Sequence, residues 1–236
     1  MKRYILVFIC SILVIFSSHY GLSQHSVGIN MKVYKPHGKF NRNVTQTPFG
    51  FSFLYEHQKN ESPFSWGSEF GIAMYYNNKY DYELIKEGYP GEFIEVDEED
   101  CFWTLHMIGQ YEFMSTPAFK SYGEVRVGMT TFFSSRTTME ENPHFEAEFK
   151  FHGTAFNTGF GAGVMVNPSR LFSKDKEPGN IWINFSTNVY TGSDVTYRSI
   201  SDSNATHILG EGKHRSLSYY TDFRLGVLFN ITQGDM

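Results

Sequence analysis

Cysteine and charge are both scarce in this chain of 236 residues. The only cysteines are Cys10 and Cys101, and Cys10 lies in an N-terminal segment predicted to be removed. Cys101 would then stand alone, which excludes an intramolecular disulfide from the mature protein. Charged residues make up 19% of the chain, whereas aromatic residues make up 17%, a high share for a soluble domain. Stability must therefore come from backbone hydrogen bonding and packing, and the rings need a core or a lipid surface.

A short apolar run opens the chain. It extends from Tyr4 to Phe16, follows Lys2 and Arg3, and precedes the small-residue segment Gly21-Leu22-Ser23. This is the pattern of a secretory signal peptide, so we predict a signal at 1–23 and a mature domain at 24–236. No later stretch reaches the roughly 18 uninterrupted apolar residues of a spanning helix. Removing the signal lowers the basic residues from 20 to 18 against 25 acidic ones, and a net charge that moves from −5 to −7 argues against a nucleic-acid partner.

A two-residue rhythm dominates the remaining sequence. In the last segment bulky apolar residues alternate with polar ones: Tyr219, Thr221, Phe223, Leu225, Val227 and Phe229 against Tyr220, Asp222, Arg224, Gly226 and Asn230. Alternation of this kind indicates a β-strand with two different faces. Eight such segments are predicted, at about 26–34, 47–57, 64–76, 101–114, 120–134, 145–166, 181–191 and 219–229.

The connections between these segments alternate in length. Short turns follow the second and fourth segments, whereas long loops are predicted at 36–46, 77–100, 135–144 and 192–215. Outer-membrane barrels have short periplasmic turns and longer extracellular loops. We therefore predict an all-β protein, an eight-stranded antiparallel up-and-down transmembrane β-barrel.

The content of the polar face separates a membrane barrel from a soluble, lipocalin-like carrier, which also has eight strands. A solvent-facing surface is usually rich in Lys and Glu, whereas this face holds mainly Gly, Ser, Thr, Asn and Tyr. Small residues suit a narrow barrel interior. Gly159, Gly161 and Gly163 lack the spacing of a dinucleotide fingerprint, so we interpret them as relieving crowding in the lumen.

Ionisable residues on the polar face would be enclosed in the lumen, where an unpaired charge costs several kcal/mol. We expect Arg126 to pair with Glu124 or Glu112, and Arg224 to pair with Asp222 or with the acidic neighbours of Lys32. Lys32 and Asp222 are expected to pair where the first and last strands meet. These groups would form a plug, although a proton or ion path remains an alternative. The predicted lumen charge network comprises Lys32, Glu69, Glu112, Glu124, Arg126, Asp222 and Arg224.

The export signal, the alternating apolar face and the loop asymmetry resemble the small outer-membrane β-barrel proteins of Gram-negative bacteria. The start at Gln24 and the glycine-rich strands are similar to barrels of the Bacteroidetes group. The resemblance implies a location in the cell outer membrane after export, with outer-membrane lipid as a neighbour. Members often end on an aromatic residue read by the insertion machinery, whereas here seven residues follow Phe229.

Function is predicted to lie in the outer loops. We expect a non-enzymatic structural, adhesive or accessory component, whose loops contact outer-membrane protein or lipoprotein partners in a larger complex. No cofactor and no metal site is predicted, because the acids between Glu92 and Asp100 lack the spacing of an EF-hand. The candidate contact surface comprises Tyr80, Tyr82, Tyr89, Phe93, Asp97 and Glu98.

Three other functions stay open. The first is a lipid-modifying enzyme, because small barrel enzymes that trim lipid A use a His and a Ser near the outer rim, as His214 could with Ser216 or Ser218. The second is a narrow ion or solute channel, although eight strands enclose an interior that side chains just fill. The third is the soluble exported carrier.

Overall fold

The computed structural model describes residues 23–43, 47–59, 62–83, 93–138, 148–172, 180–198 and 213–232. Almost all of the predicted signal at 1–23 lies outside these residues. Two short helices, α2 (Gly38–Asn43) and α3 (Pro168–Phe172), accompany the strands. The strands are β1 (Ser23–Pro36), β2 (Phe49–Lys59), β3 (Phe64–Glu83), β4 (Phe93–Ser115), β5 (Phe119–Thr138), β6 (Glu148–Val166), β7 (Ile181–Arg198) and β8 (Lys213–Thr232).

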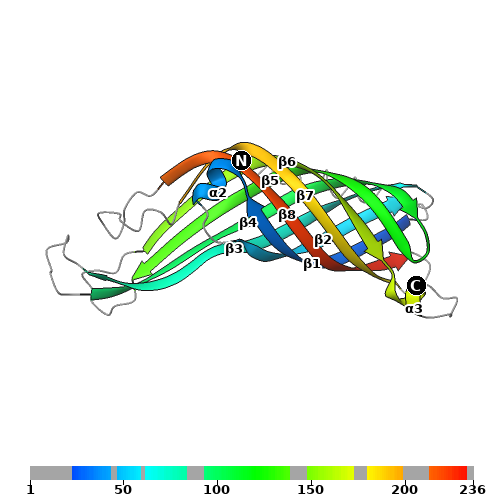
Figure 1. Ribbon diagram of the computed structural model, residues 1–236, viewed down its shortest axis with the longest axis horizontal. Helices are drawn as coiled ribbons and strands as arrows, with labels where there is room; N and C mark the ends of the chain where they lie inside the picture. The colour runs from blue at the N-terminus through cyan, green and yellow to red at the C-terminus, as the bar shows by residue number, and fades with distance from the viewer. Residues whose placement is uncertain are drawn as a thin grey trace, which may run out of the picture.

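The eight strands form one closed antiparallel barrel, which confirms the predicted fold class (Figure 1). Each strand pairs with the next in sequence, and β1 closes the ring by pairing with β8, from Gln24↔Thr232 to Pro36↔Tyr220. Closure gives every strand two neighbours and so removes the free edges of an open sheet along the paired length. Among the described residues, no helix is long and apolar enough to cross a membrane.

The strands continue into ranges for which loops were predicted. β3 runs to Glu83 and β4 begins at Phe93, so most of 77–100 is a paired hairpin rather than a loop. Similarly, 135–138 belongs to β5, 192–198 to β7 and 213–215 to β8, while 36–46 contains α2. Main-chain hydrogen bonding tolerates charged side chains where they face water, so acidic composition did not end the strands. Residues 84–92, 139–147 and 199–212 lie outside the described part of the chain.

The rim at the long-connection end is uneven. β1 ends at Pro36 and β2 begins at Phe49, so β2 pairs with β3 only as far as Met74. β3 and β4 continue well beyond that level, as their cyan and teal ribbons show in Figure 1. We call the low stretch of wall at β1 and β2 the notch; α2 lies there and contacts β8. The opposite end carries the short turns and α3.

Candidate functional site

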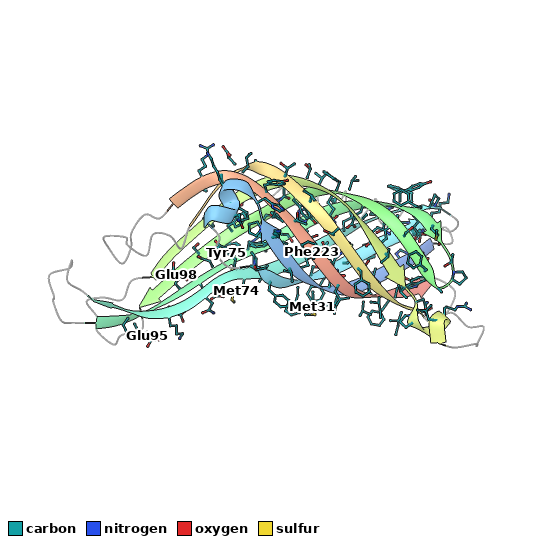
Figure 2. All side chains as sticks on the ribbon, in the orientation of Figure 1. Met31, Met74, Tyr75, Glu95, Glu98 and Phe223 are labelled. Atoms are coloured by element: carbon teal, nitrogen blue, oxygen red, sulfur yellow. The ribbon has the colours of Figure 1, made fainter. Side chains whose placement is uncertain are left out.

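The outer face of the barrel is an apolar belt. Met31, Met74 and Phe223, labelled in Figure 2, are each more than 40% exposed on three different strands. The predicted outward residues of the last strand, from Tyr219 to Phe229, lie on the outer face of β8. On β6, Phe156 and Phe160 are 71% and 67% exposed. A surface so continuously apolar matches a lipid environment and not the outside of a soluble carrier. The fold is therefore that of a transmembrane barrel.

Glu69 of β3 is the centre of the lumen. Its carboxylate lies 2.6 Å from Lys32 Nζ and 3.4 Å from Arg224 Nη1, and Arg126 Nη1 donates to the same group. Ser52 Oγ adds a hydrogen bond of 2.6 Å to Oε1. The residue is fully buried, so three cations and a hydroxyl together replace the water that a carboxylate would otherwise require.

Two further acids complete this arrangement. Glu124 lies 3.2 Å from Arg126 Nη2 and 2.8 Å from Arg224 Nη2. Asp222 lies 3.2 Å from Lys32 Nζ, across the β1–β8 seam. Three cations thus balance three carboxylates. We call these six residues the central network: Lys32, Glu69, Glu124, Arg126, Asp222 and Arg224.

For Arg126 and for Arg224, one of the two predicted alternatives is formed and the other is not. Glu112 lies near the short-turn end and pairs with Lys120 at 2.8 Å, not with Arg126. Arg224 pairs with Glu69 and Glu124 rather than with Asp222, whose carboxylate accepts from Asn188 Nδ2 at 3.1 Å. Neighbours two apart on one strand share a face, but a closed barrel also brings side chains from opposite walls together.

Neutral side chains that the sequence analysis did not single out orient the charges. Tyr190 Oη donates to Asp222 at 3.2 Å, and Arg224 Nε donates to Ser186 Oγ at 2.7 Å. Arg224 Nη2 also donates to Tyr122 Oη, 3.2 Å away. All three partners were placed inward by alternation, but nothing in the sequence distinguishes them from other polar residues of that face.

Crowding in the lumen explains the predicted inward glycines. A Cβ on Gly159 would lie 2.7 Å from the Tyr190 ring, and one on Gly163 would overlap the Tyr122 hydroxyl. The close approach of these rings therefore requires glycine on β6.

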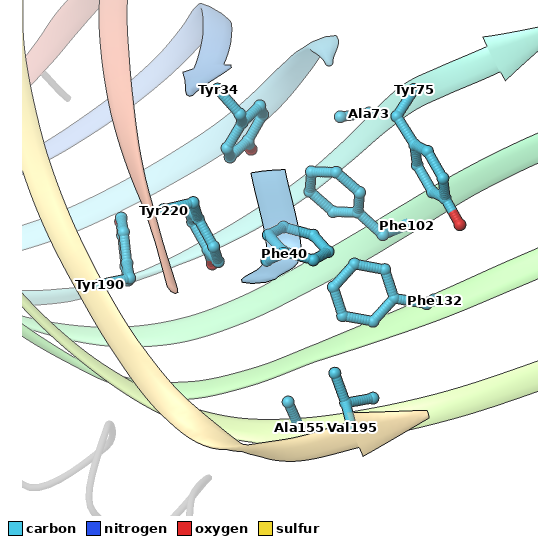
Figure 3. Packing of buried hydrophobic residues seen from close by; sticks show 10 residues of the cluster. All are labelled: Tyr34, Phe40, Ala73, Tyr75, Phe102, Phe132, Ala155, Tyr190, Val195 and Tyr220. Carbon is cyan, nitrogen blue, oxygen red and sulfur yellow. The ribbon is translucent and has the colours of Figure 1, made fainter. Parts of the chain in front are cut away.

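An aromatic cluster fills the lumen beneath the outer rim (Figure 3). Phe40 of α2 reaches into it from the notch, with its ring centroid 5.5 Å from that of Phe132. Tyr190 and Tyr220 stack at 4.7 Å beside it, toward the central network. A single turn of helix thus contributes a buried ring to a core otherwise made by strands.

The opposite end of the lumen is also filled. Leu54, Ile108 and Trp182 belong to a second buried apolar cluster there. Beside it lies a cavity of about 20 Å³, which is room for about one water molecule. Aromatic, charged and apolar layers therefore succeed one another along the axis of the lumen.

At the outer rim the pairing of β3 with β2 ends before β3 itself does. Beyond Met74, the described residues provide no strand to pair with β3 on its β2 side. On its other side β3 pairs with β4 as far as Glu83↔Phe93. We call the hairpin of 77–83 and 93–99 the rim extension; Glu95 lies far along it (Figure 2).

The predicted contact residues of the rim extension differ in their exposure and in how far the structure describes them. Asp97 is half-buried and lies 3.2 Å from Lys79 Nζ. Glu98 is only 4% exposed and faces inward, so it does not belong to an outward contact surface. The backbones of Tyr80, Tyr82 and Phe93 lie in the β3–β4 ladder, but their side chains are outside the description, as is the whole of Tyr89.

The candidate catalytic residues on β8 are described only in part. Ser216 and Ser218 are 5% and 0% exposed and lie on the inward face of β8. The His214 side chain lies outside the description. The described residues contain no group of three or more potential metal-ligating side chains. Ser218 is enclosed in the barrel, whereas Ser216 also lines a groove between α2, β7 and β8.

Comparison with known proteins adds support at the level of the fold. The sequence matches no protein-family model and no curated protein. A major outer membrane protein of Thermus thermophilus is 15% identical, with a TM-score of 0.50 over 89% of this chain and 100% of that one. Neisserial surface protein A is 10% identical, with a TM-score of 0.46 over 87% and 96%. The Escherichia coli outer membrane protease OmpT is 6% identical, with a TM-score of 0.35 over 89% and 96%. At 15% identity the likeness to the Thermus thermophilus protein shows the fold alone, a barrel of the outer-membrane kind.

Proposed function

We propose that this chain is a non-enzymatic protein of a Gram-negative outer membrane, which binds a protein partner through the rim extension. The apolar belt supports the membrane location, and the predicted signal at 1–23 would direct export. The filled lumen supports a role at the surface rather than transport, since aromatic, charged and apolar layers occupy it in turn. Membership of the Bacteroidetes-like barrels stays a prediction.

The observation that carries this proposal is the strand edge of β3. Past Met74 its outer edge has no strand partner among the described residues, while its β4 side is paired from Tyr76 to Glu83. An exposed edge of this kind can accept a strand from another chain, with main-chain hydrogen bonds giving affinity. Proteins usually shield such edges, so one with no neighbouring strand in the described part of the chain favours a binding role.

The charge of the rim extension indicates the chemistry of the partner. Asp81, Glu95 and Glu99 are exposed there, and Lys79 is the counter-charge to Asp97 and Glu95. A basic, extended segment of an outer-membrane protein or lipoprotein would complement this surface. Complementary charge of this kind accelerates encounter and fixes the register of the added strand.

Site-directed photocrosslinking in whole cells tests the proposal. A photoreactive residue at Asp81 should give a discrete protein adduct, because this position is exposed on the rim extension. The same residue at Lys59, exposed at the short-turn end, is the matched control and should give none. Absence of an adduct at Asp81, or the same adduct at both positions, would contradict partner binding at the rim.

A separate measurement addresses catalysis. Mass spectrometry of lipid A from a deletion strain should show the same species as the parent strain. A changed acylation or head-group pattern that is restored by the intact gene would overturn the non-enzymatic assignment.

A further inference from the structure

A groove of about 750 Å³ borders the notch on the outer face of the rim, where α2 meets β7 and β8. His37 lies just before α2, Lys39 belongs to α2, and β8 supplies Arg215, Leu217 and Tyr219. It lies on the side of the notch opposite the rim extension. The groove is therefore separate from the surface proposed to bind a protein partner.

The wall of the groove is held in place by interactions around His37. Its backbone amide donates to the Tyr219 carbonyl at 2.9 Å, and its Nε2 lies 2.7 Å from Thr221 Oγ1. The His37 and Tyr219 rings lie 4.9 Å apart. A site that exists before binding loses less conformational freedom when a ligand enters.

The groove combines cations with apolar surface. Lys39 is exposed, and the side chain of Arg215 is 73% exposed with Asp194 3.4 Å from its Nε. Lys35, on the outward face of β1, adds a third cation one strand away from Thr221. This group of cations contrasts with a chain whose net charge is −5. Leu217 and Tyr219 are 57% and 42% exposed beside it, so the ligand is expected to be an amphipathic anion.

The groove lies just above the apolar belt, and this position favours a lipid as the ligand. Directly below Lys35 and Thr221, the outward pair Val33 and Phe223 belongs to the apolar belt. A rise of about 3.3 Å per residue at a tilt of about 40° places Arg215 about 10 Å above Tyr219 along the barrel axis. Acyl chains on the belt would therefore bring a polar head group to the level of Lys39 and Arg215.

We infer that this groove binds the phosphorylated head group of lipid A in the outer leaflet. Lys39 and Arg215 contact the phosphate, Tyr219 and Leu217 pack against the sugar, and the acyl chains follow Val33 and Phe223. The inference rests on the proposed outer-membrane location but not on partner binding by the rim extension.

Native mass spectrometry of the full chain in non-ionic detergent tests this site. Diphosphorylated lipid A is titrated onto the parent protein, onto the double variant K39Q/R215Q and onto the matched double variant K59Q/R170Q. Each cation near an anionic lipid surface contributes about fivefold to binding, so K39Q/R215Q should bind about 25-fold more weakly. K59Q/R170Q loses the same charge at the short-turn end, away from the groove, and should bind as the parent does. Circular dichroism establishes that all three proteins are folded.

Two further arms identify the source of the phosphate. Dephosphorylated lipid A should bind the parent protein and K39Q/R215Q equally weakly, and inorganic phosphate at millimolar concentration should leave diphosphorylated lipid A bound. Equal weakening of both double variants, or displacement by inorganic phosphate, would overturn the inference. Loss of the Asp81 photoadduct with lipid A binding intact would reject the proposed partner site alone.

Discussion

Glu69 at the centre of the lumen and Lys79 at the outer rim both contact more than one opposite charge, but in different surroundings. Glu69 is fully enclosed and meets three cations, whereas Lys79 is 52% exposed and lies 3.2 and 3.9 Å from two acids. In the lumen, a charged group that loses its partner stays buried without solvation, which costs free energy. At the rim, water can solvate a charged group that loses its partner. The ion pairs of the lumen are therefore expected to contribute more to stability than those of the rim.

The same contrast exists in the backbone. Through the belt every strand has two paired neighbours, whereas at the notch both β3 and β8 continue past the ends of β2 and β1. Closure stabilises the wall, and its interruption exposes hydrogen-bonding groups. The rim extension borders the notch on one side and the groove on the other, but only the rim extension depends on such groups.

The largest effect is expected from Glu69→Gln. This change leaves Lys32, Arg126 and Arg224 short of one carboxylate in a buried site, which should lower the free energy of unfolding by about 3–5 kcal/mol. Guanidinium unfolding in phospholipid vesicles, followed by tryptophan fluorescence, measures it. Glu95→Gln is the control, because Glu95 is half-exposed and lies 3.9 Å from Lys79. Equal losses for the two variants would refute the contrast between lumen and rim.

An intermediate effect is expected from Phe40→Ala. Removing a buried ring costs up to about 3–5 kcal/mol, but we expect about 2 kcal/mol, because α2 can detach while the strands stay paired. Amide hydrogen exchange should quicken at Asn41, whose amide donates to the His37 carbonyl at 3.2 Å, and stay slow in β8.

Leu171→Ala serves as the comparison, since Leu171 is a 57% exposed residue of α3 at the other end. It should change stability by less than about 0.5 kcal/mol. If Phe40→Ala also quickens exchange throughout β8, then α2 is part of the wall and not an insertion into the notch.

The smallest effect is expected from Asp97→Asn. The Lys79–Asp97 pair is solvent-accessible, so its loss should change the free energy of unfolding by less than about 1 kcal/mol. The same unfolding experiment at low and high salt should give nearly equal values for this variant. A loss comparable to that of Glu69→Gln would mean that the rim extension is as tightly coupled to the barrel as its lumen.

Alternation predicts which residues face the lumen, but it does not predict which of their charges meet. The rhythm placed Lys32, Glu69 and Arg126 on one face, and the first and last strands had to meet for the barrel to close. It did not predict that Glu112 would pair with Lys120, because depth along the axis depends on register. The rhythm also did not show that Glu98 faces inward while its neighbour Asp97 does not. A loop prediction for 77–100 assigns no inward or outward face, whereas 93–100 belongs to β4.

The sequence alone determined that this chain is a barrel with an apolar outer face and a polar, glycine-containing lumen. The reason is local: a strand turns successive side chains to opposite faces, so the faces can be read from the order of the residues. Only the tertiary structure decided which charges meet, where α2 inserts Phe40 and where the wall is low. These features depend on the stagger between strands far apart in the chain, such as Lys32 opposite Arg224 across the β1–β8 seam, and no local pattern encodes that stagger.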